Sequence, residues 1–420
     1  MYVSLLTASR DKPVLSCGAK EAAARAPHIV VGVTSSQTCL VLTGRLRALR
    51  ESGFRITLIS SPGAILERLS LAEGVDAVAI PQKRVVAPLA DLLSLLRLWR
   101  VLLNLRPDIV EFSTPKAGLL GMLAATFARI PRRVYLLRGL KLESQRGLKR
   151  LVLQAGESTA AACAHIVLCN SPSLREQAIA LHLAPEEKLQ ILGSGSSKGV
   201  DVERFYSGPT SLRERFGIPA DAHVLGFVGR FTRDKGIPAL IDAFDLILKT
   251  APRAYLLMVG WFDKAEDAIT PELRRRIASH PRIVCTGFVA DAAPYYRAMD
   301  LLILPTLREG FPNVVLEASA SGIPVLTTNA TGARDSIAPG ETGLLVCSDA
   351  ASISQTTLKL LSDPELCRCM GTAGRRRAAE QFLDRRIFSL TTAFYRELLQ
   401  RGAIEDRSKA KSMDLAVPLP

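Results

Sequence analysis

The chain has 420 residues, of which 48% are hydrophobic and 22% are charged, and it carries a formal net charge of +14. This length is too great for one hydrophobic core and suits two domains of about 200 residues each. The composition is that of a globular protein and excludes disordered and collagen-like classes.

No stretch reaches roughly 18 uninterrupted apolar residues, so we expect no transmembrane helix. The run 89–105 is interrupted by Arg97 and Arg100, which favours an amphipathic helix. The first residues hold too short an apolar run for a secretory signal. The eight cysteines form no CxxC pair, which predicts reduced thiols and no zinc site.

Most of the net positive charge lies in residues 1–195. A basic surface binds nucleic acid, an anionic membrane or a phosphorylated substrate, or is simply solvated. Only 5% of the residues are aromatic and no recognition motif is present, so we do not expect nucleic acid as a partner. For the helix at 89–105, contact with anionic lipid and packing against a sheet both remain open.

Residues 1–26 are polar and alanine-rich and predict a flexible extension. Buried strands then alternate with helices, which is typical of a parallel sheet. The predicted strands are 28–38, 55–60, 75–81, 107–113, 132–139 and 165–173. This alternation predicts one doubly wound domain over 27–195, although the first turn lacks the G-x-G-x-x-G dinucleotide fingerprint.

A glycine-rich segment at 189–205 predicts the crossing into a second domain, 196–382, with a second α/β series. Its predicted strands are 223–231, 254–260, 282–289, 301–306, 323–328 and 342–347. We expect 383–402 to form a closing helix that returns to the first domain, followed by a disordered tail at 403–420. Ligands of such sheets bind at the carboxyl ends of the strands, which here face an interdomain cleft.

The stretch 301–321 reads as a strand, a glycine turn and a helix entered through Asn313. We expect the amides before and in the first turn of this helix to point outward without intrahelical partners. They lie at the positive end of the helix dipole, where an anion such as phosphate binds. Two acids, Glu309 and Glu317, flank this site. Carboxylates beside a phosphate site accept hydrogen bonds from sugar hydroxyls, so the stretch predicts a nucleotide-sugar pocket.

The segment 228–236 follows the first strand of the second domain and contains Gly229, Arg230 and Lys235. The glycine permits close approach of the backbone. A guanidinium group and an ammonium group five positions apart suit a pyrophosphate. A surface turn with solvated charges is the alternative, which the nearby acids disfavour.

These motifs together resemble those of the retaining GT-B glycosyltransferases of the group-1 (family 4) class. The resemblance is carried by G-R-F-x-x-x-K-G, by V-G-x-x-D-x-x-E-D at 259–267 and by E-G-F-P-N-V-V-L-E. It covers roughly residues 28–400. SSPG (60–63), STPKAGLLG (113–121) and LLRGLKLE (136–143) are similar to the bacterial surface-polysaccharide branch. The resemblance implies an α/β, GT-B fold of two Rossmann-like doubly wound domains that face each other across a cleft.

The resemblance also implies a role for each motif residue. Arg230 and Lys235 would hold the donor diphosphate, and Glu309 would bind hydroxyls of the donor sugar. Glu317 would bind the ribose, and the backbone near 287–289 would face the nucleobase. The implied donor-binding positions are Gly229, Phe288, Val289, Gly310, Phe311, Asn313, Val314 and Glu317. Transfer with retention would need no protein nucleophile, no cofactor and no divalent metal.

One position departs from the family. Where many members carry the histidine of a Y-T-x-H-G pattern, this chain has Arg138. A guanidinium group accepts no hydrogen bond, so Arg138 would contact the diphosphate or an acceptor phosphate, or form a structural salt bridge.

The acceptor would bind the N-terminal domain. Lys116 and Thr114, beside Ser113, suit an acceptor phosphate such as that of a polyprenyl-diphosphate-linked glycan, and a plain helix-start loop is the alternative. The loop 35–38 would bind sugar hydroxyls or be a plain loop. We expect Asp263, Glu266 and Asp267 to be solvated acids or a helix cap.

The sequence hypothesis is therefore a cytoplasmic retaining glycosyltransferase, peripheral on the inner face of the plasma membrane. It would move a sugar from a UDP-sugar to a lipid-linked glycan in capsule, exopolysaccharide or O-antigen assembly. The alternatives are a nucleotide-sugar 2-epimerase, a non-catalytic nucleotide-sugar-binding protein and, from charge alone, a nucleic-acid-binding protein.

Overall fold

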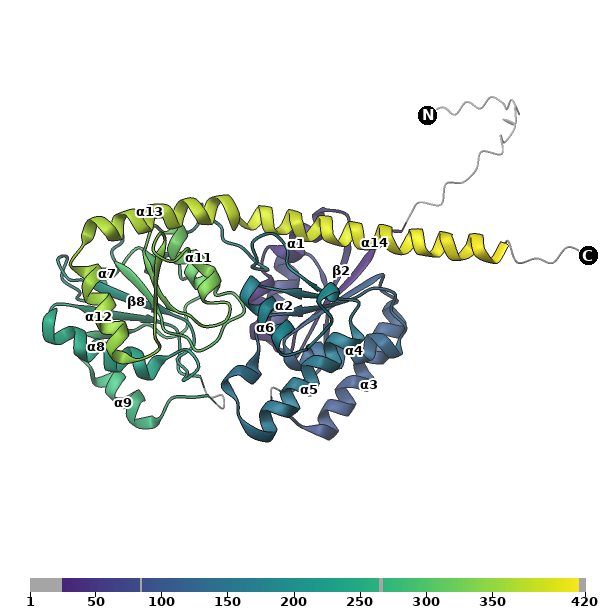
Figure 1. Ribbon diagram of the computed structural model, residues 1–420, viewed down its shortest axis with the longest axis horizontal. Helices are drawn as coiled ribbons and strands as arrows, with labels where there is room; N and C mark the ends of the chain where they lie inside the picture. Colours follow the sequence, from purple (N-terminus) through teal and green to yellow (C-terminus); the bar gives the residue numbers. More distant parts are fainter. Residues whose placement is uncertain (1–24, 84, 264–266, 415–420) are drawn as a thin grey trace, which may run out of the picture.

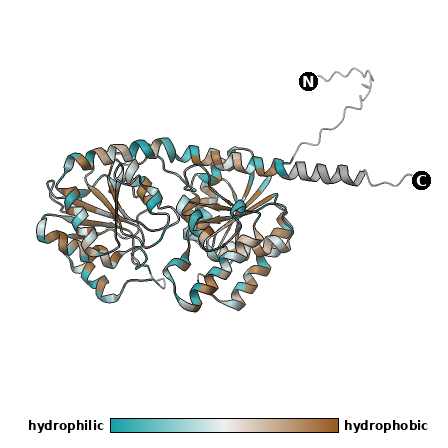
Figure 2. Ribbon diagram, in the orientation of Figure 1, coloured by the Kyte–Doolittle hydropathy of each residue, from teal (hydrophilic) through white to brown (hydrophobic). Residues whose placement is uncertain are grey.

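The computed structural model describes residues 25–83, 85–263 and 267–414, and it has two α/β domains side by side (Figure 1). The predicted N-terminal extension and the end of the predicted tail lie almost wholly outside the described residues. The central strands of both sheets are largely buried and apolar, whereas the helix surfaces are mixed (Figure 2). Both domains are doubly wound, so the predicted fold class is confirmed.

The first domain contains a seven-stranded parallel sheet in the order β3-β2-β1-β4-β5-β6-β7. The order reverses between β1 and β4, which places a ligand crevice at the carboxyl ends of these strands. The strands are β1 (His28–Gly32), β2 (Arg55–Ser60), β3 (Asp76–Ala79), β4 (Ile109–Ser113), β5 (Arg133–Leu137), β6 (Ile166–Cys169) and β7 (Leu189–Gln190).

Helices cover both faces of this sheet. One face packs on α3 (Pro88–Leu105), α4 (Pro115–Phe127), α5 (Gly147–Cys163) and α6 (Pro172–Ala180). The other face packs on η1 (Ser36–Leu42), α1 (Arg45–Glu51) and α2 (Ala64–Glu73). Residues 141–144 form the separate 3₁₀ turn η2 (Lys141–Ser144), and α5 begins at Gly147.

The second domain contains a six-stranded parallel sheet in the order β10-β9-β8-β11-β12-β13, with its switch point between β8 and β11. The strands are β8 (Val224–Val228), β9 (Tyr255–Val259), β10 (Ile283–Cys285), β11 (Leu301–Leu304), β12 (Val325–Thr328) and β13 (Gly343–Val346). The helices are α7 (Leu212–Arg215), α8 (Ile237–Thr250), α9 (Pro271–Ser279), α10 (Ala293–Tyr296), α11 (Asn313–Ala320), α12 (Ala350–Leu361) and α13 (Pro364–Gln381).

The helix α14 (Asp384–Asp414) leaves the second domain and runs back along the first (Figure 1). Its residues Phe394 and Tyr395 are buried in the core that also contains β1 and α1. The helix continues to Asp414, whereas the sequence analysis expected a disordered tail from residue 403. The stretch contains no proline and is rich in Ala, Lys, Arg and Glu, which favour a helix.

Direct hydrogen bonds connect the two domains beside the cleft. Thr331 Oγ1 donates to Glu143 Oε1 over 2.6 Å. The amide of Ser173, at the start of α6, donates to Asp335 Oδ2 over 3.0 Å, and Ser173 Oγ accepts from the amide of Gly332 over 2.7 Å. The carboxyl ends of both sheets are thereby held close together.

Two general features complete the description. The cysteines within the described residues are free thiols, as predicted. Within the same residues, no helix combines the length and the apolar character that crossing a membrane requires.

Candidate active site

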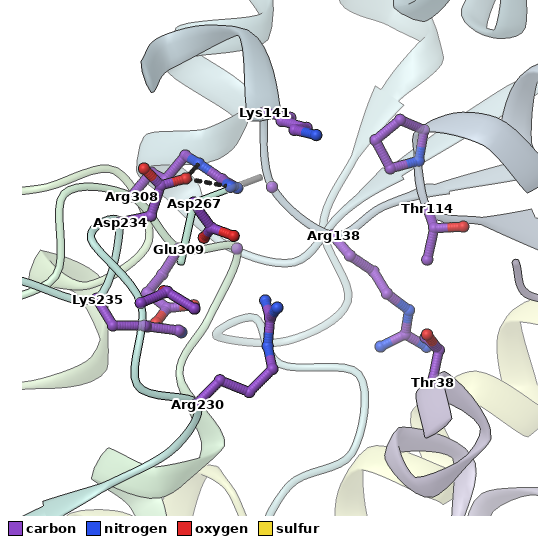
Figure 3. A pocket seen from close by; sticks show the side chains of 14 residues that line it. Thr38, Thr114, Arg138, Lys141, Arg230, Asp234, Lys235, Asp267, Arg308 and Glu309 are labelled. Carbon is purple, nitrogen blue, oxygen red and sulfur yellow. Dashed lines mark hydrogen bonds and ion pairs between the residues drawn. The ribbon is translucent and has the colours of Figure 1, made fainter. Parts of the chain in front are cut away.

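A cavity of about 310 Å³ lies between the two domains, at the carboxyl ends of both sheets (Figure 3). The first domain contributes Thr38, Thr114, Pro115, Arg138, Gly139 and Lys141 to its lining. The second contributes Arg230, Thr232, Asp234, Lys235, Asp267, Arg308, Glu309 and Gly310. Five cations and three acids therefore meet in one small volume, which suits a ligand that has both phosphate and hydroxyl groups.

Arg230 enters the cavity directly after β8, from the turn in which Gly229 has a φ of +146°. Its Nη1 donates to Asp263 Oδ2 over 2.5 Å. Asp263 follows β9, the neighbour of β8, and its side chain is only 9% exposed. The carboxylate thus fixes the direction of the guanidinium group while the latter stays open to the cavity.

Lys235 and Glu309 contact each other within the cavity. Lys235 lies on the turn between β8 and α8, and Glu309 lies on the turn between β11 and α11. Since β8 and β11 are neighbours at the switch point, their carboxyl ends bring the two turns together. The ammonium group and the carboxylate that the sequence analysis assigned to one site are therefore adjacent.

A second ion pair closes the cavity on the side of η2. Arg308 Nη2 donates to Asp234 Oδ2 over 2.6 Å, as Figure 3 shows. Ser144, from the first domain, donates to Asp234 Oδ2 over 3.1 Å and accepts from Arg308 Nε over 3.1 Å. The pair therefore connects the two domains directly at the edge of the cavity.

Arg138 is the principal cation on the wall of the first domain. Its Nε donates to Ser113 Oγ over 3.1 Å and its Nη1 donates to Ser197 Oγ over 2.7 Å. Its Nη2 is buried and has no hydrogen-bond partner among the described residues. Burial, and then repulsion by Arg45, lower the pKa of Arg138 to about 10, so the group remains a cation at neutral pH.

A buried charge cluster lies behind Arg138. Arg45 Nη1 donates to Glu111 Oε1 over 2.8 Å, and the hydroxyl of Tyr395 on α14 donates to Glu111 Oε2. Burial opposes ionisation of Glu111, but the charge of Arg45 outweighs it and lowers the pKa of Glu111. Among the described residues Arg138 forms no structural salt bridge, since Glu111 is bound to Arg45 and Tyr395 instead.

The backbones of the two domains touch at Gly310. A Cβ atom at this position would lie 2.0 Å from the carbonyl oxygen of Arg138, so only glycine allows the approach. On the facing strand end, Gly139 has a φ of +126° and its backbone meets Gly310 in turn. This contact brings Glu309 and Arg138, on opposite walls, into the same cavity.

Glu317 lies inside α11 and outside the lining of the cavity. The hydroxyl of Tyr296 donates to Glu317 Oε2 over 2.8 Å. Burial and the nearby carboxylate raise the pKa of Tyr296 well above its usual value, so the hydroxyl remains a donor. Tyr296 is a functional candidate that the sequence analysis missed, because a tyrosine in a short helix carries no motif.

The remaining predicted donor-binding residues also lie outside the lining. Phe288 is 58% exposed and its ring lies 5.4 Å from that of Trp261, so these two aromatic side chains neighbour the predicted nucleobase region. Phe311 instead packs on Phe382 in the core. Asn313 and Val314 form the first turn of α11, whose N-cap is Pro312. Amides of a first turn have no intrahelical acceptor.

The two predicted acceptor residues separate in the structure. Thr114 lines the cavity, and its hydroxyl is bonded to that of Thr34 over 2.6 Å. Lys116 does not line it: the ammonium group donates to Asp91 Oδ1 over 2.7 Å and also contacts the carbonyl oxygen of Val85. A charged partner on α3 thus draws Lys116 away from the cavity.

Several further lining residues were missed or misjudged. Thr232 is fully buried and its hydroxyl has no partner among the described residues, and Lys141 lines the opposite wall. Asp263 is the partner of Arg230 rather than a solvated acid, and Asp267 lines the cavity, whereas Glu266 lies outside the described residues. The pattern V-G-x-x-D after the strand next to β8 was the available signal.

The chain is similar to known glycosyltransferases in sequence. Residues 222–363 match the family model described as glycosyl transferases group 1, and residues 41–195 match that of a glycosyl transferase 4-like domain. The chain is 35% identical, over 88% of its own length and 97% of the relative's, to the capsular polysaccharide biosynthesis glycosyltransferase CapM of Staphylococcus aureus.

The chain is also similar to a second relative in sequence and to a solved structure in fold. The chain is 27% identical to the UDP-Gal:alpha-D-GlcNAc-diphosphoundecaprenol alpha-1,3-galactosyltransferase of Escherichia coli, over 62% of this chain and 68% of the relative. Among solved structures, Anabaena Alr3699/HepE in complex with UDP and glucose superimposes with a TM-score of 0.72 and 20% identity, over 88% of this chain and 98% of that one. At 20% identity, the similarity to the Anabaena structure shows a shared fold.

Proposed function

Because this chain belongs to the group 1 glycosyl transferases, and is thus a glycosyltransferase with two Rossmann-like domains, we propose that it takes its sugar from a UDP-sugar and transfers it with retention. The observation that carries the proposal is the meeting of Arg138, Arg230, Lys235 and Glu309 in one interdomain cavity. Three cations and one sugar-binding acid match the parts of a nucleotide-sugar donor.

In this proposal the donor diphosphate lies between Arg230 and Lys235. The guanidinium group is held in direction by Asp263, which leaves its other N–H groups for phosphate oxygens. The buried hydroxyl of Thr232 lies beside them with an unused hydrogen-bonding capacity. The donor displaces Glu309 from Lys235, so that the carboxylate becomes available to hydroxyls of the sugar.

The nucleoside extends from the cavity toward α11. Glu317 accepts hydrogen bonds from the two ribose hydroxyls, and Tyr296 orients its carboxylate. The nucleobase lies near residues 287–289, beside Trp261 and Phe288. Relatives and structural neighbours named for UDP or UDP-sugars favour uracil over other bases for this chain.

The transfer step follows from these positions. An acceptor hydroxyl attacks the anomeric carbon from the same face as the departing diphosphate. The bond from the anomeric carbon to the β-phosphate oxygen breaks, and the hydroxyl proton passes to that phosphate oxygen. Arg230, Lys235 and Arg138 neutralise the negative charge that develops on the leaving group, which is the task a divalent cation has in other transferases.

We further propose a polyprenyl-diphosphate-linked glycan as the acceptor, in the assembly of a capsule or related surface polysaccharide at the inner face of the plasma membrane. The name of the Escherichia coli relative includes a diphosphoundecaprenol-linked sugar and supports this class of acceptor. The name of the Staphylococcus aureus relative supports capsule assembly. Thr114 and Arg138 lie on the wall of the first domain, where the acceptor enters.

A two-stage experiment tests the proposal. Nucleotide sugars are screened by thermal shift, and the one that stabilises the protein most is incubated with membrane extract and EDTA. We expect labelled sugar to enter the lipid-extractable fraction, with an anomeric configuration by NMR that matches the donor. Inversion at C2 of the UDP-sugar without acceptor would instead identify a 2-epimerase. Strict dependence on added metal would refute the metal-independent mechanism.

A further inference from the structure

The outward face of α3 is apolar, contrary to the rule for helices of a soluble domain. Ser94, Leu98 and Leu102 are buried against the sheet. The opposite side of the helix therefore faces outward. That surface carries Leu89, which is 81% exposed, and four more exposed leucines. They are Leu92, Leu93, Leu96 and Leu103.

The helix α5 repeats the pattern. Its inner face buries Glu157, Ala160 and Ala161, whereas Leu148, Leu151 and Val152 are exposed at helical spacing. Leu148 is 76% exposed, close to the value for Leu89. Two helices of the same layer therefore present leucine-rich strips to the outside.

The two strips belong to one layer of the molecule. The helix α4 lies between α3 and α5 and packs on both, and all three helices cover the same face of the first sheet (Figures 1 and 2). Of the seventeen exposed large apolar side chains in the described part of the chain, eleven lie in this layer. We call them the α3–α5 surface: Val85, Val86, Leu89, Leu92, Leu93, Leu96, Leu103, Phe127, Leu148, Leu151 and Val152.

The charges around the α3–α5 surface are of one sign. Arg97 and Arg100 are exposed on α3, and Arg146 and Lys149 are exposed at the start of α5. The helices α3, α4 and α5 contain only two acids, and both are turned inward. Asp91 binds Lys116, and Glu157 accepts a hydrogen bond from Tyr135 over 2.5 Å. The surface is thus apolar with a basic border, a combination that suits an anionic partner.

The surface adjoins the active site. Helices that follow parallel strands begin at the carboxyl edge of the sheet, where the cavity lies. The most exposed leucines of the α3–α5 surface, Leu89 and Leu148, are in the first turns of α3 and α5. The Lys116 ammonium contacts the carbonyl oxygen of Val85, next to Pro115 of the cavity lining. One end of the surface is therefore close to the acceptor wall.

We infer that the α3–α5 surface docks on an anionic lipid bilayer, with its leucines among the acyl chains and its arginines at the headgroups. Charge complementarity favours a bilayer over a second copy of this basic chain. The docking brings the cavity near the headgroup plane, where the diphosphate of a polyprenyl acceptor lies. This last consequence rests on the proposed function, whereas the docking itself does not.

Vesicle sedimentation with the full chain tests the inference. Vesicles of phosphatidylcholine that contain phosphatidylglycerol are compared with vesicles of phosphatidylcholine alone. We expect strong binding only to the anionic vesicles. The double variant Leu89→Glu/Leu93→Glu should lower the partition coefficient by about ten-fold or more. Arg97→Gln/Arg100→Gln should lower the partition coefficient by roughly five-fold for each charge removed. Added salt should also lower the partition coefficient.

The matched control is Leu71→Glu/Leu246→Glu, which adds the same two charges at exposed leucines of α2 and α8, outside the surface. It should bind vesicles like the unmodified protein. Equal sedimentation of the Leu89→Glu/Leu93→Glu variant and the unmodified protein would overturn the inference. The inference would also be overturned if light scattering showed that the unmodified protein is a dimer and that Leu89→Glu/Leu93→Glu is a monomer. Thermal shift by UDP-sugars without vesicles reports the donor site separately, and all these variants should retain it.

Discussion

The Lys235 ammonium group lies against the Glu309 carboxylate, although 74 residues separate them in the chain. Each residue sits on the turn after one of two neighbouring strands, β8 and β11. The contact is partly buried, with side-chain exposures of 23% for Lys235 and 14% for Glu309. Each residue therefore holds the other in the cavity, and under the proposed function the donor replaces this pairing.

The first prediction concerns this pair. Lys235→Ala and Glu309→Gln should each lower kcat/KM for sugar transfer by about 10²–10³-fold, because each removes a group that stabilises the transition state. Steady-state rates with labelled donor measure this loss. The matched control is Lys249→Ala at the exposed end of α8, which should be neutral. Near-normal turnover in either cavity variant would contradict the assignment.

The second prediction separates orientation from chemistry. Tyr296→Phe removes the hydroxyl that donates to Glu317 and leaves the buried ring in place. We expect KM for the UDP-sugar to rise about ten-fold with little change in kcat, since loss of one hydrogen bond to a charged group costs about 1.5 kcal/mol. An unchanged KM would show that Glu317 needs no such orientation.

The third prediction concerns Arg138, whose buried Nη2 has no partner among the described residues. Arg138→Ala should lower kcat by about 100-fold or more, and Arg138→Lys should restore only part of it, because an ammonium group lacks the fork geometry of guanidinium. The pKa of about 10 keeps Arg138 charged at neutral pH, so its titration should leave no inflection in the rate between pH 6 and 8. Full activity of the lysine variant would indicate that charge alone is required.

The fourth prediction is a pH dependence of stability. Burial raises the pKa of Glu157 from 4.5 to about 7. The folded state then binds more protons than the unfolded state between these values, so stability should fall as pH rises from about 4.5 to 7. Glu157→Gln keeps an acceptor for Tyr135 and removes the charge. The Tm of this variant should exceed that of the unmodified protein above pH 7, and the excess should shrink at pH 5; a constant difference across this range would contradict it.

The fifth prediction concerns the attachment of α14. Glu111→Ala leaves Arg45 buried without its carboxylate, which should lower the free energy of unfolding by about 3–5 kcal/mol. Tyr395→Phe keeps the packing and removes the hydroxyl that donates to Glu111 and accepts from Arg45, which should cost about 1.5–3 kcal/mol. Urea unfolding monitored by circular dichroism measures both. A smaller loss for Glu111→Ala than for Tyr395→Phe would be inconsistent with the buried pair.

Local patterns predicted much of the fold. The runs 55–60 and 301–306 are apolar and bounded by turn residues, and they form β2 and β11. Hydrophobic periodicity is a local property of the sequence, so it can be read without knowing which residues are in contact. The end of α14 was predicted less well, since helix length there depends on weak propensities over 403–414 rather than on a stop signal.

The site was predicted where a residue follows a strand within a motif. Arg230, Lys235 and Glu309 were assigned in this way and meet in the cavity. Lys116 also follows a strand, but Asp91 from another helix determines its direction. Likewise, the V-G-x-x-D pattern marks Asp263, but whether its carboxylate is solvated or paired depends on Arg230, which lies on the turn after the neighbouring strand β8.

The sequence by itself determined the two α/β series, the strand ends that carry the cations and acids, and the family. These depend on the order and spacing of residues along the chain. Only the tertiary structure decided which acid holds Arg230, that Tyr296 holds Glu317, and that the leucines of α3 and α5 form one surface. It also decided that the buried Thr232 hydroxyl has no partner within the part of the chain that the structure describes. The physical reason is that hydrogen-bond pairing and burial depend on residues brought together by the packing of the strands and helices, whatever their separation in the chain.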